Sequence, residues 1–149
     1  ARRYRDALTV CFAAILGVAT SELLKVLVAR PRPADALLHP HGLSYPSGHS
    51  MGAAALSVSL ALVVVASERV PRGAAAWACA GAAAWTLLMM WSRTALQVHW
   101  ITDTVAGAAL GVASAILARA LWGASPSAPQ MPPAPAPPAQ PEPSTPLWR

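Results

Sequence analysis

Long apolar blocks separated by short polar segments run along the chain, and they give the first prediction. Four blocks stand out, over Ala7–Val28, Met51–Ala66, Ala74–Trp91 and Ile101–Trp122. A helix needs about 20 mostly apolar residues to cross roughly 30 Å of hydrocarbon. All four come near this length, although Met51–Ala66 is short and is expected to borrow flanking residues or to tilt. The pattern therefore predicts four membrane-spanning helices.

A soluble all-α bundle is the alternative, because Ala-rich runs such as "GAAAWACAGAAAW" also pack closely in water. A soluble bundle needs a polar face on each helix, and Met51–Ala66 and Ala74–Trp91 offer only scattered Ser and Thr. The chain is 55% hydrophobic and 11% charged, with a mean hydropathy of +0.44, which is more apolar than soluble domains usually are. We therefore predict an all-α transmembrane helical bundle.

The composition changes after Trp122, where the chain reads "GASPSAPQMPPAPAPPAQPEPSTPLWR". Proline has no amide donor, and this segment has little apolar area to bury. The change predicts a membrane-embedded domain over residues 1–122 and a disordered Pro-rich tail over 123–149. Cys11 and Cys79 lie inside apolar blocks with no partner at metal-binding spacing, so we expect them to serve packing.

Four crossings would bring distant polar residues to one side of the membrane. Residues 29–50 and 92–100 connect helices on that side, whereas the N-terminus, the 67–73 turn and the tail lie on the other. Nearly all unusual side chains fall on the first side: Lys25, Arg30, Arg32, His39, His41, Ser47, His49, Arg93, His99 and Asp103. The sequence therefore predicts a polar site at one end of the bundle.

The segment "KVLVARPRP" contributes two cations to this site. Lys25 lies near the end of a predicted helix, and Arg32 lies between Pro31 and Pro33. The prolines stop the helix and restrict the backbone, so Arg32 is held at one angle. Taken alone, the segment is typical of a basic cluster that meets lipid head groups.

The segment "YPSGHS" predicts a loop that turns into a helix beginning near Ser50. Unpaired amides at a helix N-terminus, next to a glycine that lets an oxyanion approach, make an anion site. His49 would then lie beside the anion and exchange a proton with it. A lone "SGH" is otherwise typical of an ordinary turn.

The segment "SRTALQVHWITD" places His99 and Asp103 four residues apart, on one face of a helix. Asp103 can accept the Nδ1 proton of His99, which leaves Nε2 as a nucleophile or base. Arg93 adds a planar fork of donors that suits phosphate oxygens. Taken alone, a His/Asp pair at this spacing is more often structural.

The three segments together indicate a phosphate site. Three cations, a helix N-terminus and two histidines can balance phosphoryl charge as metal ions do in other enzymes. The sequence offers no carboxylate cluster for Mg²⁺. His39 and His41 lack a third ligand, so we interpret them as loop residues that touch the substrate head group. We expect no metal and no other cofactor.

The segments Lys25-x6-Arg32-Pro33, Pro46-Ser47-Gly48-His49 and Ser92-Arg93-x5-His99-x3-Asp103 resemble the three-part signature of the type 2 phosphatidic acid phosphatase (PAP2) superfamily. The resemblance implies that His99 is a nucleophile that forms a phosphohistidine, oriented by Asp103. His49 would protonate the leaving oxygen and later activate water, without a metal. The implied ligands of the phosphate oxygens are Lys25, Arg32, Ser47, Gly48 and Arg93. Integral membrane members commonly carry six helices, with the first motif closing the third; here it closes the first.

These observations predict an integral membrane phosphatase for a lipid phosphate or diphosphate, such as phosphatidic acid or a polyprenyl carrier. Its expected partners are the lipid and the membrane, and no nucleic acid. One alternative is a relative of the superfamily's vanadate-binding haloperoxidases, which are soluble and much larger. Another is a non-catalytic phospholipid-binding protein, which the loss of either histidine would favour. Excess Lys and Arg mark the cytoplasmic side, so the site should face the periplasm or exterior, away from Arg2, Arg3, Arg5, Arg69, Arg72 and Arg119.

Overall fold

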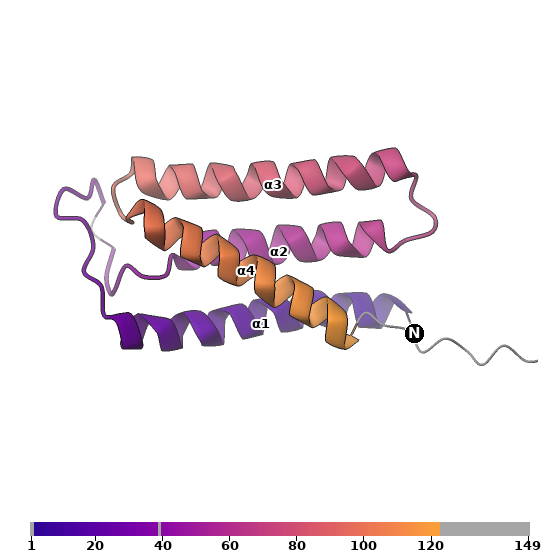
Figure 1. Ribbon diagram of the computed structural model, residues 1–149, viewed down its shortest axis with the longest axis horizontal. Coiled ribbons are helices and arrows are strands. Elements are labelled where there is room, and N and C mark those ends of the chain that lie inside the picture. The colour runs from indigo at the N-terminus through magenta and orange to yellow at the C-terminus, as the bar shows by residue number, and fades with distance from the viewer. Residues whose placement is uncertain (1, 39, 123–149) are drawn as a thin grey trace, which may run out of the picture.

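The computed structural model describes residues 2–38 and 40–122, and within them the chain forms four helices and no strand. Figure 1 shows α1 (Arg2–Val28), α2 (Gly48–Val65), α3 (Arg72–Ala95) and α4 (Ile101–Trp122). All four are long and apolar enough to cross a membrane, which confirms the predicted all-α fold. His39 and residues 123–149 lie outside the described residues, so the domain boundary and the disordered tail stay predictions.

The helix bounds differ from the apolar blocks where polar residues begin a helix. α2 starts at Gly48, before the apolar block, because Ser47 caps it: the Ser47 hydroxyl accepts a hydrogen bond from the Ser50 amide at 3.4 Å. Serine is a favoured N-cap because its oxygen replaces a missing helical partner. α2 thus gains the flanking residues that it was expected to borrow.

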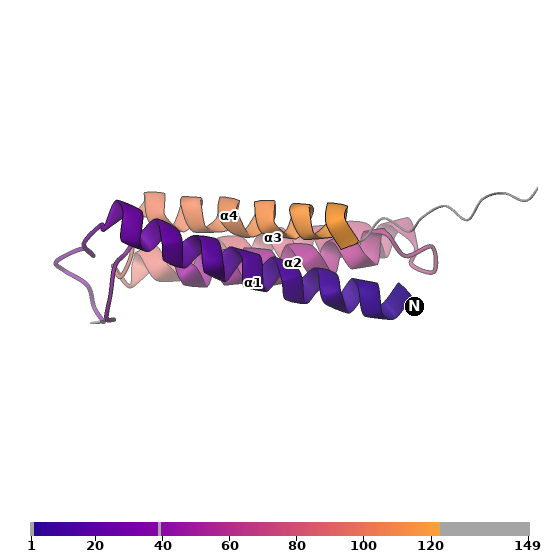
Figure 2. The ribbon, with the colours of Figure 1, turned by 90° about the horizontal axis from the view of Figure 1, so that it is seen from below.

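α2 occupies the centre of the bundle, with α1 and α3 beside it and α4 crossing over it (Figures 1 and 2). Gly107 and Gly111, one turn apart on α4, lie against the α2 backbone. A β-carbon on Gly107 would collide with the Ser47 carbonyl oxygen, and one on Gly111 with the Met51 carbonyl oxygen. Small residues at this spacing let membrane helices approach closely. The contact fixes the amino end of α2 against α4.

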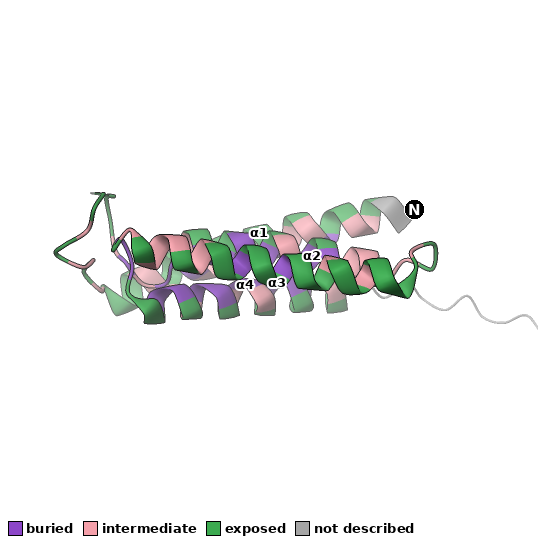
Figure 3. Ribbon diagram, turned by 90° about the horizontal axis from the view of Figure 1, so that it is seen from above, coloured by how far each residue is buried: buried purple, intermediate pink, exposed green. Residues whose placement is uncertain are grey.

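Small residues fill the interior, and large apolar side chains cover the outside. The core cluster and the side chains packed against it are Ala13, Ala115, Ala118, Phe12, Val58 and Leu62. Trp77 is 79% exposed and Leu87 is 62% exposed, and Figure 3 shows exposed positions along the outer helix faces. Lipid chains are as apolar as these side chains, so a bilayer can cover them without cost.

The expectation that Cys11 and Cys79 serve packing is wrong. Both are free thiols on exposed positions of α1 and α3. A membrane helix is apolar on its lipid-facing side as well as on its packed side. An apolar block therefore does not tell which of its residues point into the bundle.

The carboxyl ends of α1 and α3 and the amino ends of α2 and α4 meet at one end of the bundle, on the left in Figure 1. α1 stops there because Ala29 takes a left-handed conformation with φ 48° and two prolines follow. We call this the site end. The opposite end, with the α2–α3 turn, is the far end. The described polar residues that the sequence predicted to converge, which are all of that set except His39, lie at the site end.

Candidate active site

Arg32 is anchored by backbone oxygens from two segments of the site end. Its Nη1 donates to the Val98 carbonyl at 2.8 Å, its Nε to the Gly42 carbonyl at 3.1 Å, and its Nη2 to the His41 carbonyl at 3.4 Å. These bonds fix the plane of the guanidinium. The proline-flanked loop thus presents Arg32 at a set angle, as the sequence predicted.

Arg32 also selects a tautomer of His99. Its Nη1 lies 3.3 Å from His99 Nε2, and a guanidinium can only donate. Nε2 therefore faces Arg32 with its lone pair, and the ring proton of neutral His99 is on Nδ1. This is the tautomer in which Nε2 can act as a nucleophile.

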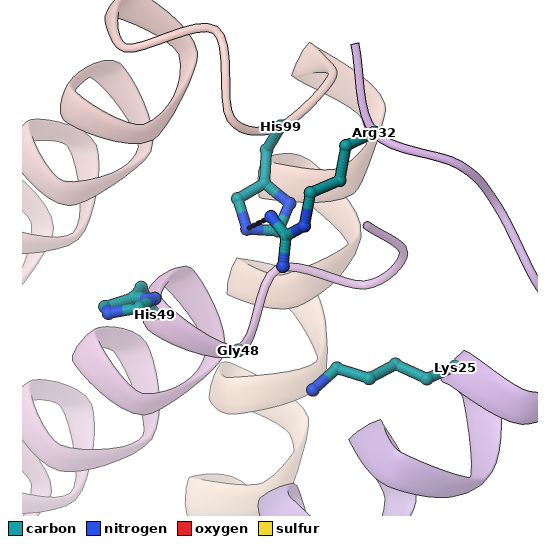
Figure 4. A pocket seen from close by; sticks show the side chains of 5 residues that line it. All are labelled: Lys25, Arg32, Gly48, His49 and His99. Carbon is teal, nitrogen blue, oxygen red and sulfur yellow. Dashed lines mark hydrogen bonds between the residues drawn. The ribbon is translucent and has the colours of Figure 1, made fainter. Parts of the chain in front are cut away.

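A cavity of ≈ 290 Å³ lies between these groups, lined by Lys25, Arg32, Gly48, His49 and His99. In Figure 4, His99 and Arg32 lie side by side, while Lys25 reaches in from α1 and His49 lies on the first turn of α2. Lys25 Nζ is 3.9 Å from where a Gly48 β-carbon would be, and it also pairs with Glu22 at 2.6 Å. Three distant segments thus meet around one cavity.

The first turn of α2 supplies a second kind of anion binding. Gly48 and His49 open the helix, where backbone amides lack intrahelical acceptors and the helix dipole is positive. The missing side chain at Gly48 leaves these amides open to an oxyanion. His49 is exposed beside them, so a titratable ring lies next to the anion site.

The motif implies that Ser47 is a phosphate ligand, but the structure places its hydroxyl at the N-cap of α2. It is fully buried, and its hydroxyl is 3.4 Å from the Ser50 amide and 3.2 Å from the Ser50 hydroxyl. Its own amide donates to the Asp103 carbonyl at 2.9 Å. Ser47 therefore caps α2 and ties it to α4. Its role as a phosphate ligand stays a prediction.

Arg93 lines a second, smaller cavity of ≈ 70 Å³ that also involves Arg32, His49 and His99. Its Nη2 donates to the Ser92 hydroxyl at 3.2 Å. Its Nε is buried with no hydrogen-bond partner among the described residues, and buried donors without partners are rare in proteins. Arg93 thus keeps donor capacity close to both histidines.

Asp103 is fully buried beside His99. Its Oδ2 accepts a hydrogen bond from the Trp100 amide at 3.0 Å and lies 3.6 Å from His99 Nδ1. That separation exceeds the usual hydrogen-bond length, and Nδ1 has no partner within the part of the chain that the structure describes. The predicted pair is therefore adjacent, but its hydrogen bond is not closed in this structure.

Arg30 belongs to the predicted cluster, but sequence reasoning assigned it no role. Its Nη1 donates to Asp103 Oδ1 at 2.8 Å and to the Thr102 hydroxyl at 2.6 Å. Its guanidinium also lies 5.4 Å from the centre of the Tyr45 ring. A buried carboxylate is costly unless it is paired, so Arg30 compensates Asp103. The repeated Arg-Pro in "ARPRP" is the signal that could have found it.

The pKa of His99 is lowered from its ordinary value by burial and by the charge of Arg32. The Ser44 backbone and Asp103 oppose this shift. The balance favours neutral imidazole, which is the form that can attack an electrophile. Burial also lowers the pKa of Arg32, against the effect of Asp103, but an arginine remains charged in proteins.

The site end can therefore bind a tetrahedral oxyanion and attack it. Charged donors and helix amides stabilise negative oxygens, and His99 Nε2 offers a lone pair within the same cavity. Residues 2–38 and 40–122 contain no group of three or more His, Cys, Asp or Glu side chains that could hold a metal ion. His41 is exposed on the loop and contributes its carbonyl to Arg32.

The fold and the site together define a helical membrane protein with a cationic, histidine-bearing cavity at one end of its bundle. The chain matches the family model of the PAP2 superfamily over residues 6–126, and it belongs to this superfamily. The matched region contains every motif position from Lys25 to Asp103. The resemblance seen in the three motifs is thus confirmed.

Among solved structures, the chain is similar to the first transmembrane PAP2 type phosphatidylglycerolphosphate phosphatase from Bacillus subtilis. The TM-score is 0.72 at 29% identity, and the match covers 78% of this chain and 58% of that one. The chain therefore spans less than two thirds of the length of that protein. No curated protein sequence matches it significantly.

Proposed function

We propose that this protein is an integral membrane phosphatase that removes phosphate from a lipid phosphate or diphosphate through a phosphohistidine on His99. The observation that carries the proposal is the position of the His99 ring in one cavity with Lys25, Arg32 and His49. Membership of the PAP2 superfamily supports it, because a phosphohistidine intermediate is typical of that family.

The proposed reaction has two steps. First, the Nε2 lone pair of His99 attacks phosphorus, the bond from phosphorus to the lipid-side oxygen breaks, and His49 gives that oxygen a proton. Second, His49 takes a proton from water, which attacks the phosphohistidine and releases inorganic phosphate. Each histidine thus returns to its starting state.

The proposed roles of the remaining residues follow from their contacts. Asp103 holds the Nδ1 side of His99 and stabilises the ring as it gains positive charge. The phosphate oxygens are held by Lys25, Arg32, Gly48 and Arg93. Ser47 joins them only when its hydroxyl turns away from the α2 cap. The cations supply the positive charge that metal ions supply in other phosphoryl-transfer enzymes.

Two findings support a lipid as the substrate. The cavity lies at the end of four membrane-length helices, where a head group can enter from water while its chain stays in the bilayer. The Bacillus subtilis protein is named for a lipid phosphate monoester. We infer a phosphatidic acid-like lipid or a polyprenyl phosphate or diphosphate. The non-catalytic alternative is disfavoured because both histidines line the same cavity.

Phosphate release tests this function. The purified protein is assayed in detergent with phosphatidic acid, phosphatidylglycerol phosphate and a polyprenyl diphosphate, each with and without EDTA. We expect phosphate from at least one lipid, no effect of EDTA, and no activity in the His99→Ala variant. No release from any lipid would contradict the phosphatase assignment, and inactivation by EDTA would contradict the metal-independent route.

We also propose that the site end faces the periplasm or cell exterior, because an excess of Lys and Arg marks the cytoplasmic side and the far side of the chain carries Arg2, Arg3, Arg5, Arg69, Arg72 and Arg119. The background for the test is Cys11→Ala with Cys79→Ala, which removes both exposed thiols. An impermeant thiol reagent on intact cells should label Ala34→Cys at the site end and not Gly73→Cys at the far end. The reverse labelling means the opposite orientation.

A further inference from the structure

The lipid side of the substrate has to lie next to His49. In the proposed reaction, which this inference takes as its basis, His49 protonates the oxygen that leaves phosphorus. That oxygen carries the lipid, whether the substrate is a monophosphate or a diphosphate. A general acid acts within hydrogen-bond reach of the group that it protonates. The hydrocarbon chain therefore begins near His49, and its first contacts are with the protein surface next to His49.

That surface is an exposed, apolar face of α2. Gly52, Leu56 and Leu60 follow His49 at steps of three, four and four residues, which places all four on one helix face. All are exposed, Leu56 and Leu60 each to 50%. Nothing lies within 4 Å of the place that a Gly52 β-carbon would take, so there is room directly beside His49. We call these four residues the outer face of α2.

The neighbouring helices leave the outer face uncovered. α1 and α3 pack on α2 but make no contact with each other in the described part of the chain. α4 packs elsewhere on α2, where Gly111 lies against Met51 and Ala55. In Figure 1, α4 crosses in front of α2 between α1 and α3; Met51 and Ala55 are both buried there, whereas the outer face points away from them.

The length of the outer face also suits a lipid chain. Leu60 lies eleven positions after His49, which is about 16 Å along the helix at a rise of 1.5 Å per residue. This is roughly half of the 30 Å hydrocarbon core, which is the depth that one chain reaches from its head group. A second apolar depression of ≈ 440 Å³, lined by residues of α2, α3 and α4, includes Leu87 and Met90 but none of the residues that line the cavity with the histidines.

We propose that the outer face of α2 binds the hydrocarbon chain of the lipid phosphate, which runs from His49 past Gly52 and Leu56 to Leu60. The phosphate then lies in the cavity behind His49, and the lipid-side oxygen lies at the ring. Catalysis and chain binding share the first turn of α2, so the chain helps to align the leaving oxygen with its acid.

The test compares two substrates with the same head group, dioleoyl and dibutyryl phosphatidic acid, since only the first has a chain long enough to cover Leu56. Gly52→Phe fills the space beside His49, and Leu56→Ala removes apolar contact area further along the outer face. We expect kcat/KM for the dioleoyl lipid to fall about fifteenfold for Gly52→Phe and about fourfold for Leu56→Ala, as when the lipid chain loses the burial of about two methylenes and about one methylene. The dibutyryl lipid should change less than about twofold, because it makes few of these contacts.

Leu87→Ala is the matched control, since Leu87 is exposed on α3 and lines the other depression. It should leave both substrates unaffected. A selective loss with Leu87→Ala, or equal losses with both substrates in both outer-face variants, would overturn the proposal. A change of oligomeric state without a change in chain-length dependence would also overturn it, because the face would then pack against protein. If wild type releases no phosphate from either substrate, the proposed function itself fails.

Discussion

The two ends of the bundle both carry several cations, yet they hold them in different ways. At the far end, Arg69 and Arg72 are exposed in and after the α2–α3 turn, and Arg119 pairs with Asp6 at 3.2 Å. At the site end, Arg32 donates to three backbone carbonyls, and Arg30 donates to a fully buried carboxylate. Arg69 and Arg72 are thus exposed at the surface of the far end, whereas Arg30 and Arg32 are held by fixed partners at the site end.

This difference shows why charge alone does not make a phosphate site. An exposed cation is screened by water and pays side-chain entropy to adopt one position. A guanidinium that backbone carbonyls already orient can meet phosphate oxygens without that loss. We therefore expect site-end residues to be sensitive to substitution and far-end cations of equal charge to be insensitive.

The largest contrast is expected at His49, because His41, His49 and His99 lie at the site end, whereas the described residues of the far end include no histidine. His49→Ala should lower kcat with a lipid phosphate on the order of 10²–10⁴-fold, the usual worth of a general acid–base group. With p-nitrophenyl phosphate, whose leaving group needs little protonation, phosphoenzyme formation should be much less affected. Single-turnover kinetics measure the loss of rate with the lipid phosphate and with p-nitrophenyl phosphate. Equal losses with the two substrates would mean that His49 does not protonate the leaving oxygen.

A direct comparison of the two ends pairs Arg32→Gln with Arg69→Gln, which remove the same charge. Loss of one positioned donor to a charged transition state typically costs about 10²–10³-fold, and we expect this loss in kcat/KM for Arg32→Gln. Arg69→Gln should stay within about twofold, since an exposed surface charge contributes little. A large loss in Arg69→Gln would show that overall charge, and not anchoring, governs phosphate binding.

A smaller effect is expected in the pH profile. Burial and Arg32 lower the pKa of His99, so the neutral nucleophile persists as pH falls through about 6.5, the ordinary histidine value. The acid limb of kcat/KM, measured with p-nitrophenyl phosphate, should have its midpoint below that value. Arg32→Gln removes a charge that lowers the pKa and should move the midpoint upward, reducing relative activity near pH 6. Lys25→Gln serves as the control and should leave the midpoint in place; an equal shift in both variants contradicts the assignment.

The sequence predicted the helices well because hydropathy and helix length are local properties. Ile101–Trp122 agrees with α4 at both ends, and the block at Met51 missed only the polar first turn of α2, which the Ser47 cap creates. The convergence of Lys25, Arg32 and His99 could also be predicted, because four crossings leave the connecting segments no other arrangement. The order and spacing of the three motifs also predicted the PAP2 superfamily.

The contacts within the site could not be predicted in this way. Arg30 and Arg32 are each followed by a proline, yet Arg30 binds Asp103 whereas Arg32 binds backbone carbonyls and contacts His99. The direction of each depends on the path of residues 29–47, which hydropathy does not encode. The motif implied that Ser47 binds phosphate, but a motif does not show which way the side chain points. In the structure Ser47 caps α2, and its carbonyl oxygen lies close against Gly107 of α4.

The role of His99 as the nucleophile is tested by trapping the phosphoenzyme by rapid quench with labelled lipid phosphate. We expect an acid-labile, base-stable phosphoenzyme in wild type and none in His99→Ala. In His49→Ala with p-nitrophenyl phosphate, the phosphoenzyme should accumulate, because the second step then lacks its base. Arg69→Gln at the far end should give the wild-type amount. A phosphoenzyme in His99→Ala, or one with acid-stable chemistry in wild type, would contradict His99 as the nucleophile.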